Sequence, residues 1–155
     1  MVYEIVTLEE KMITGISVRT NNSDPNMGAM IGELWNRFYS NGIVETLKEK
    51  KAPVFGVYTE YESDEKGDYT VIAGCETEKI SEKERVSPEY KCCRIPAGCY
   101  AKFTVEGNGE EVAAAWREIW QMNLSRTFES DFEEYQEDRE KGLRIQIYVG
   151  LRNGE

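Results

Sequence analysis

The chain has 155 residues, 40% of them hydrophobic, which is enough to bury one sizeable core or the cores of two small fused modules. Its 29 acidic residues outnumber its 19 basic ones, so the net charge of −10 argues against direct binding to a nucleic-acid backbone, which requires a basic stripe. The absence of histidine excludes Ser–His and Cys–His nucleophile systems and histidine-ligated zinc.

The first predicted elements are a strand and an amphipathic helix. Ile13–Thr20 alternates apolar and polar residues, as a half-buried strand does. Asp24 followed by Pro25 is typical of a helix start. The apolar residues that follow recur at helical spacing: Met27, Met30, Ile31, Leu34, Trp35 and Phe38. Asn41-Gly42 is a stop signal, after which Ile43–Lys51 could form a further helical turn.

Two strands should complete the first half, and a charged segment should separate it from the second. The strands are predicted at about Val54–Tyr61 and Tyr69–Thr77, joined by a polar hairpin loop that contains Gly67. The segment Glu78–Glu89 is rich in charge and contains a proline, so we interpret it chiefly as a linker.

The second half begins with a strand region at Tyr90–Val105, broken at Pro96-Ala97-Gly98. A second helix is predicted after it, with an apolar stripe formed by Val112, Ala115, Trp116, Ile119 and Trp120. A polar loop through Ser130 should then lead to a short strand at Phe132–Tyr135. In the last strand, Leu143, Ile145, Ile147, Val149 and Leu151 should share one face.

The two halves repeat one another. Glu33-Leu34-Trp35 returns as Glu118-Ile119-Trp120, and Phe55-Gly56-Val57-Tyr58 returns as Phe132-Glu133-Glu134-Tyr135. Each copy ends in an alternating strand. Two copies that meet across a pseudo-two-fold axis leave a groove at the seam. Since Gly56 in one copy corresponds to Glu133 in the other, the groove should have one open wall and one negative wall.

Each half is therefore predicted to have the order strand–helix–strand–strand, and its helix should cover one face of an antiparallel sheet. The predicted fold class is α+β, with about eight strands, two main helices and a cleft between the halves. We expect a single domain over residues 1–155, with module one at about 1–78 and module two at about 90–155.

Other sequence features indicate the cellular location of the protein, the state of its cysteines and whether it needs a cofactor or a metal. No apolar run approaches the length of a membrane span and the first residues lack a secretory signal, so we expect a cytoplasmic protein without a membrane partner. The cysteines show no C-x-x-C pairing and should be reduced thiols: Cys75, Cys92, Cys93 and Cys99. No phosphate-binding glycine motif occurs, and we expect no cofactor and no metal.

Three motifs in order link the chain to a known family: Gly15–Thr20, the stretch from Val57–Tyr61 to Gly67–Tyr69, and Asp131–Tyr135. With them the sequence resembles the DNA gyrase inhibitor-like (GyrI-like) superfamily, also described as the effector-binding domain of AraC-type and MerR-type transcription activators. The resemblance covers essentially the whole chain. It looks like the stand-alone form, because no helix-turn-helix segment fits in front of Ile13.

The resemblance implies the tandem strand–helix–strand–strand (SHS2) fold and the binding of hydrophobic, often cationic, small molecules between the halves. It also implies that the glutamate of a Phe-Glu-x-Tyr motif, here Glu133, lies in that cleft. Some relatives are described as hydrolysing cyclopropane-containing genotoxins with a glutamate and a tyrosine. In this chain, Glu133 with Tyr58 or Tyr135 could take those roles.

Strand alternation independently puts Glu133 and Tyr135 on one face, opposite Phe132 and Glu134. Aromatic residues on the elements at the seam should line the cleft with them: Trp35, Phe38, Tyr58, Trp116 and Trp120. Each of these aromatic side chains could instead pack in the core. Gly56 would leave room for a ligand, or would serve a bulge or close strand packing.

The sequence supports three hypotheses. The first is a protein that binds drug-like or dye-like cations, with Glu133 as counter-ion, and sequesters them or presents them to a partner. The second is a hydrolase in which Glu133 directs water and a tyrosine donates a proton. The third is an inhibitor of gyrase or another protein partner through its acidic surface. The natural ligand and the oligomeric state are not given by the sequence.

Overall fold

The computed structural model describes residues 2–40, 53–64, 66–77, 90–107, 109–138 and 142–152. In this part of the chain, two helices and eight strands follow in the order β1 (Glu4–Leu8), β2 (Lys11–Thr20), α1 (Met27–Ser40), β3 (Val54–Thr59), β4 (Tyr69–Glu76), β5 (Lys91–Ile95), β6 (Gly98–Glu106), α3 (Gly109–Gln121), β7 (Arg126–Asp138) and β8 (Gly142–Leu151). The predicted α+β class with its two main helices is confirmed.

All eight strands belong to one antiparallel sheet in the order β1-β6-β8-β7-β3-β4-β2-β5. The two halves meet at the centre, where β3 pairs with β7. At each outer end, the first strand of one half pairs with the other half, because β1 joins β6 and β5 joins β2. The halves are therefore interlocked through a continuous sheet.

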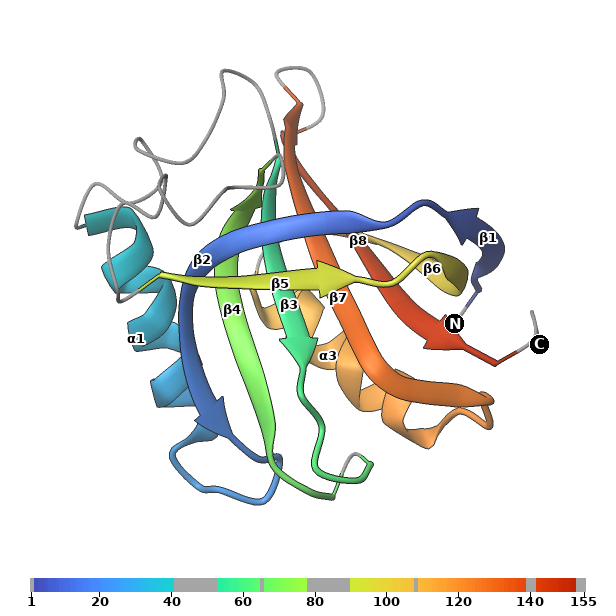
Figure 1. The fold of residues 1–155 in the computed structure, drawn as a ribbon, viewed down its shortest axis with the longest axis horizontal. Helices are drawn as coiled ribbons and strands as arrows, with labels where there is room; N and C mark the ends of the chain where they lie inside the picture. The colour runs from blue at the N-terminus through green and yellow to red at the C-terminus, as the bar shows by residue number, and fades with distance from the viewer. Residues whose placement is uncertain are drawn as a thin grey trace.

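The helices cover one face of the sheet and the curled ends of the sheet cover the other. Figure 1 shows α3 behind the central strands and α1 at the left beside β2, with β2 and β5 crossing in front of β3 and β7. Under α3 lies one buried cluster that includes Phe103 and Ile147, and under α1 lies another that includes Leu34 and Phe38. A third cluster, centred on Phe55 and Phe132, fills the opposite face.

Local sequence explains where the helices begin and which face each buries. The Asp24 carboxylate accepts a 2.8 Å hydrogen bond from the backbone N–H of Asn26, just before α1. Glu110 lies in the first turn of α3, where it complements the helix dipole. The predicted stripe of α3 is buried up to Ile119, whereas Trp120 at its end is 36% exposed.

The sequence analysis missed one strand and misplaced the start of another. The N-terminal strand β1 was not predicted, since its exposed residues at the sheet edge carry little apolar periodicity. The predicted polar loop before Phe132 is instead the first part of β7, which begins at Arg126. Polar residues are tolerated in this strand because they pair with one another: the Ser130 hydroxyl lies 3.0 Å from that of Thr59, and Arg126 forms a buried ion pair with Asp131.

Some predicted features lie outside the described residues, namely the helix stop at Asn41-Gly42, the further turn at Ile43–Lys51 and the linker Glu78–Glu89. Neither of the described helices is long and apolar enough to cross a membrane.

Candidate functional site

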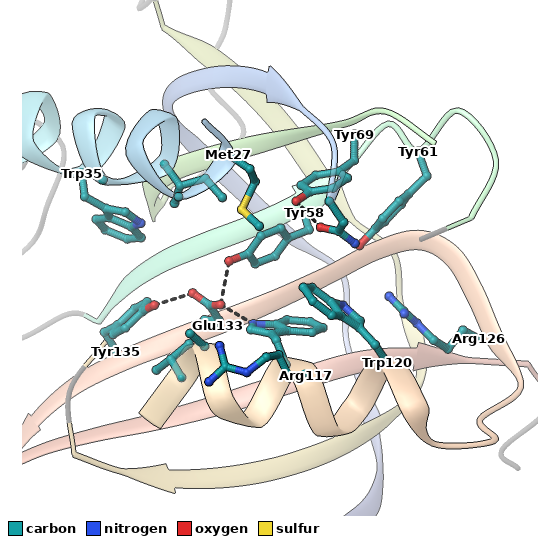
Figure 2. A pocket seen from close by; sticks show the side chains of 17 residues that line it. Met27, Trp35, Tyr58, Tyr61, Tyr69, Arg117, Trp120, Arg126, Glu133 and Tyr135 are labelled. Carbon is teal, nitrogen blue, oxygen red and sulfur yellow. Dashed lines mark hydrogen bonds between the residues drawn. The ribbon is translucent and has the colours of Figure 1, made fainter. Parts of the chain in front are cut away.

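A cavity of about 590 Å³ lies between the two helices and the central strands. Its floor is the junction of β3 and β7, and its side walls are α1 and α3 (Figure 2). The lining is mainly apolar and aromatic, formed by Asn22, Met27, Gly28, Ile31, Gly32, Trp35, Tyr58, Tyr61, Tyr69, Val112, Ala113, Trp116, Arg117, Trp120, Arg126, Glu133 and Tyr135. Such a concave aromatic site is the form that small-molecule binding sites usually take.

Glu133 lies at the floor of this cavity, where its side chain is only 1% exposed. Three donors point at its carboxylate, as Figure 2 shows. The hydroxyl of Tyr58 donates to Oε2 at 2.7 Å, the indole N–H of Trp116 donates to the same oxygen at 2.5 Å, and the hydroxyl of Tyr135 donates to Oε1. The donors come from β3, α3 and β7, so both halves of the protein hold this one group.

The charge of Glu133 has no cationic partner: none of the ion pairs found among the described residues includes it. Burial raises the pKa of Glu133 above the usual range of glutamate, and the three hydrogen bonds partly offset that rise. Burial and the nearby carboxylate also raise the pKa values of Tyr58 and Tyr135, so both phenols remain protonated donors. The floor therefore presents a negative charge that is stabilised by dipoles alone.

The pseudo-two-fold axis passes through this point. Gly56 pairs directly with Glu133 across β3 and β7, and the flanking pairs Phe55 with Glu134 and Val57 with Phe132 are symmetric about it. A Cβ at Gly56 would lie 3.0 Å from Glu133 Oε1 and 3.0 Å from Trp35 Cζ2. Gly56 and Glu133 are equivalent positions that face one another, and the space between them and the helices has room for only one side chain. Because that side chain is the carboxylate of Glu133, the opposite position must be glycine.

The same pseudo-two-fold symmetry relates the two helices, α1 and α3, that form the walls of the cavity. Each helix contributes five residues to the cavity, and aligning Trp35 with Trp120 aligns all five pairs. The pairs are Met27 with Val112, Gly28 with Ala113, Ile31 with Trp116, Gly32 with Arg117, and Trp35 with Trp120. The α1 wall thus has glycine where the α3 wall has alanine or arginine. A Cβ at Gly28 or Gly32 would meet no atom within 4 Å, so packing does not require either glycine.

One end of the cavity is closed by a polar cluster. Asp131, which is fully buried, accepts hydrogen bonds from Arg126 at 2.7 Å, from the Tyr61 hydroxyl at 2.5 Å and from the backbone N–H of Gly150 at 2.8 Å. A β-bulge between Arg126 and Asp131, with Phe128 at φ 54°, folds the guanidinium back over the Phe128 ring. The Asp131 charge is therefore neutralised, unlike that of Glu133.

The structure brings six of the eight sequence-predicted site residues into the cavity lining: Trp35, Tyr58, Trp116, Trp120, Glu133 and Tyr135. Gly56 lies beneath the carboxylate and is not part of the lining. Phe38 does not reach the cavity; it is fully buried under α1, because its position on the helix faces the sheet.

Sequence reasoning missed several lining residues. Tyr61 and Tyr69 close the end of the cavity, and Tyr69 donates a 2.6 Å hydrogen bond to Asn22. Arg117 lies next to the apolar stripe of α3, a position that reads from sequence as solvated surface. Extending the repeat along both helices would have found it. Among the described residues, no cluster of acidic or cysteine side chains could hold a metal ion.

Comparisons with known proteins identify a matching family and several proteins with a similar sequence or fold. Residues 4–151 match the Cass2 family model, described as integron-associated effector binding protein. YobU of Bacillus subtilis (strain 168), which carries the name of a transcriptional regulator protein, is 31% identical over 96% of both chains. The integron cassette protein VCH_CASS2 from the mobile metagenome of Vibrio cholerae has a TM-score of 0.78 and 29% identity, covering 97% of this chain and 95% of its own. SAV2435, solved with tetraphenylphosphonium bound, has a TM-score of 0.77 and 19% identity over 99% and 95%.

Proposed function

The chain belongs to the Cass2 family of effector-binding proteins, within the GyrI-like superfamily and related to proteins named as transcription regulators, and on this basis we propose that it binds hydrophobic organic cations in its cavity. One observation carries the proposal: Glu133 is a buried carboxylate without a cationic partner among the described residues, at the floor of an aromatic cavity. A bound cation would supply the missing charge.

Electrostatics indicate why a cation is favoured over a neutral molecule of the same shape. At 4 Å from the carboxylate and an effective dielectric constant near 20, a positive charge gains about 4 kcal/mol before desolvation costs are subtracted. Each aromatic face adds about 0.5–2 kcal/mol. The cavity offers such faces from both halves, including Trp35 on α1 and Trp120 on α3 (Figure 2).

The relatives support the same ligand class. SAV2435, which shares the fold, binds tetraphenylphosphonium, a lipophilic cation. A family of effector-binding proteins with a relative named as a transcriptional regulator suits a protein that detects or sequesters such compounds.

The Glu133–Tyr contacts also suit the second hypothesis, a hydrolase of electrophilic cyclopropanes. A carboxylate with two phenol donors could direct water and protonate a leaving group. However, three donors already occupy the two oxygens of Glu133, and this arrangement favours holding a charge over activating water. Turnover of a cyclopropane substrate that is abolished by Glu133→Gln would establish the hydrolase instead.

Intrinsic tryptophan fluorescence tests the proposal, because three tryptophans line the cavity. The protein is titrated with a planar cationic dye and with a neutral analogue of similar size. We expect saturable quenching by the cation, at least tenfold weaker in Glu133→Gln. The matched control is Glu134→Gln, which removes a charge from the opposite face of the same strand. Equal affinity in the parent and in Glu133→Gln would refute the assignment.

A further inference from the structure

The cavity is not uniformly negative. Its charged lining residues are Glu133, Arg117 and Arg126, and Asp131 lies just behind Arg126. Arg126 and Asp131 form an ion pair at 2.7 Å and so neutralise each other. Two charges of opposite sign remain for a ligand, namely the carboxylate of Glu133 at the floor and the guanidinium of Arg117 on α3. A ligand that carries only a positive charge would satisfy the first and be repelled by the second.

Arg117 is available to a ligand. No ion pair or hydrogen bond of Arg117 is found in the part of the chain that the structure describes, and its side chain is exposed. It follows Trp116, the α3 residue that donates to Glu133, so the α3 wall carries Arg117 beside the residue that contacts the carboxylate at the floor (Figure 2). Being exposed, Arg117 lies toward the mouth of the cavity, whereas Glu133 is closed off at the floor.

The opposite wall is shaped to take the body of a ligand. Gly32 occupies the position on α1 that Arg117 occupies on α3, and Gly28 lies one turn before it. Glycine is unfavourable inside a helix, where Gly32 lies, and no neighbouring atom prevents a side chain at either position. The space in front of these glycines is open, and both unneutralised charges lie on the other half of the protein.

We propose that, given the proposed function of the cavity, its preferred ligands are amphoteric: aromatic cations that also carry an acidic group, with the positive centre at Glu133 and the acidic group at Arg117. A guanidinium binds a carboxylate through two parallel hydrogen bonds, which a neutral ester cannot accept with the same strength. The glycine wall of α1 takes the aromatic body. The specificity-determining residue beyond Glu133 is therefore Arg117.

Two dyes with the same cationic ring system separate this proposal from the general one. Rhodamine 110 carries a free carboxylate, and rhodamine 123 is its methyl ester. Dissociation constants are measured by fluorescence anisotropy for the parent, for Glu133→Gln, for Arg117→Gln, and for Arg37→Gln, an exposed arginine on α1 outside this cavity. We expect the parent to prefer the acid over the ester by about two- to fivefold, which matches one partly screened ion pair. Arg117→Gln should reduce that preference to about one, and Arg37→Gln should leave it unchanged.

The outcomes distinguish the two claims. Suppose that both dyes bind, that Glu133→Gln weakens the affinity for each, and that the parent binds the acid no more tightly than the ester. The amphoteric preference is then refuted, while cation binding at Glu133 stands. The amphoteric preference is also refuted if the parent prefers the acid but Arg117→Gln leaves that preference intact. If neither dye binds, both the preference and the proposed function are refuted.

Discussion

Replacing Gly28 and Gly32 with alanine should stabilise the protein and weaken ligand binding at the same time. Gly32 lies inside α1, where alanine is favoured over glycine by about 1 kcal/mol, whereas Gly28 is the second residue of the helix, where the preference is smaller. Because a Cβ at either position would meet no atom within 4 Å, no steric cost should offset this gain. The double variant should therefore gain about 1 kcal/mol, which for a chain of this size raises Tm by about 2–4 °C.

The binding side of this prediction follows from position, since both methyl groups would project into the cavity. Calorimetric unfolding measures Tm, and titration with tetraphenylphosphonium measures affinity, which should fall severalfold. The reverse change on the other wall, Ala113→Gly, is the control: it should lower the free energy of unfolding by about 1 kcal/mol without weakening binding. An unchanged Tm in the double variant would show that another interaction requires the glycines. A higher Tm with unchanged affinity would show that the ligand does not use the α1 wall.

Three further predictions concern the floor and the end of the cavity. The raised pKa of Glu133 predicts that cation affinity falls as the pH drops through that pKa. It also predicts that the stability contributed by this carboxyl group, fully present below its unfolded pKa of about 4.3, is lost as the pH rises through the folded pKa; urea unfolding and cation titration at several pH values should show both trends weakened in Glu133→Gln. Gly56→Ala should reduce cation affinity in a calorimetric titration, because its Cβ would lie 3.0 Å from both Glu133 and Trp35 and one of them must shift; an unaffected affinity would contradict the proposed floor. Asp131→Asn should cost about 3–5 kcal/mol of stability in denaturant unfolding because it leaves the buried Arg126 charge uncompensated, and a loss below about 1 kcal/mol would contradict this account of the ion pair.

The repeat in the sequence was the strongest predictor of the fold. Aligning Phe55–Tyr58 with Phe132–Tyr135 matched Gly56 with Glu133, and the structure shows that these equivalent positions face one another where β3 pairs with β7. The exchange of β1 and β5 between the halves could not be predicted, because strand periodicity does not say which strand is the neighbour.

The candidate site was predicted less completely than the fold. Helical spacing placed Trp35 and Phe38 on one apolar stripe, but the stripe is wider than the cavity, so only Trp35 reaches it. Arg126 was missed because a polar segment before a strand reads as a loop; its burial depends on Asp131, a partner recognisable only in three dimensions. Arg117 was missed because an arginine beside a helical stripe looks like ordinary surface.

The most direct test of the central claim compares two ions of nearly identical shape and opposite charge. Isothermal titration calorimetry with tetraphenylphosphonium and with tetraphenylborate keeps the apolar surface of the ligand constant and reverses its charge. Cation binding at Glu133 predicts saturable binding of the phosphonium, at least tenfold weaker in Glu133→Gln, and no saturable binding of the borate to the parent protein. Equal binding of the two ions, or phosphonium binding that is indifferent to Glu133→Gln, would contradict the claim that this carboxylate selects the ligand.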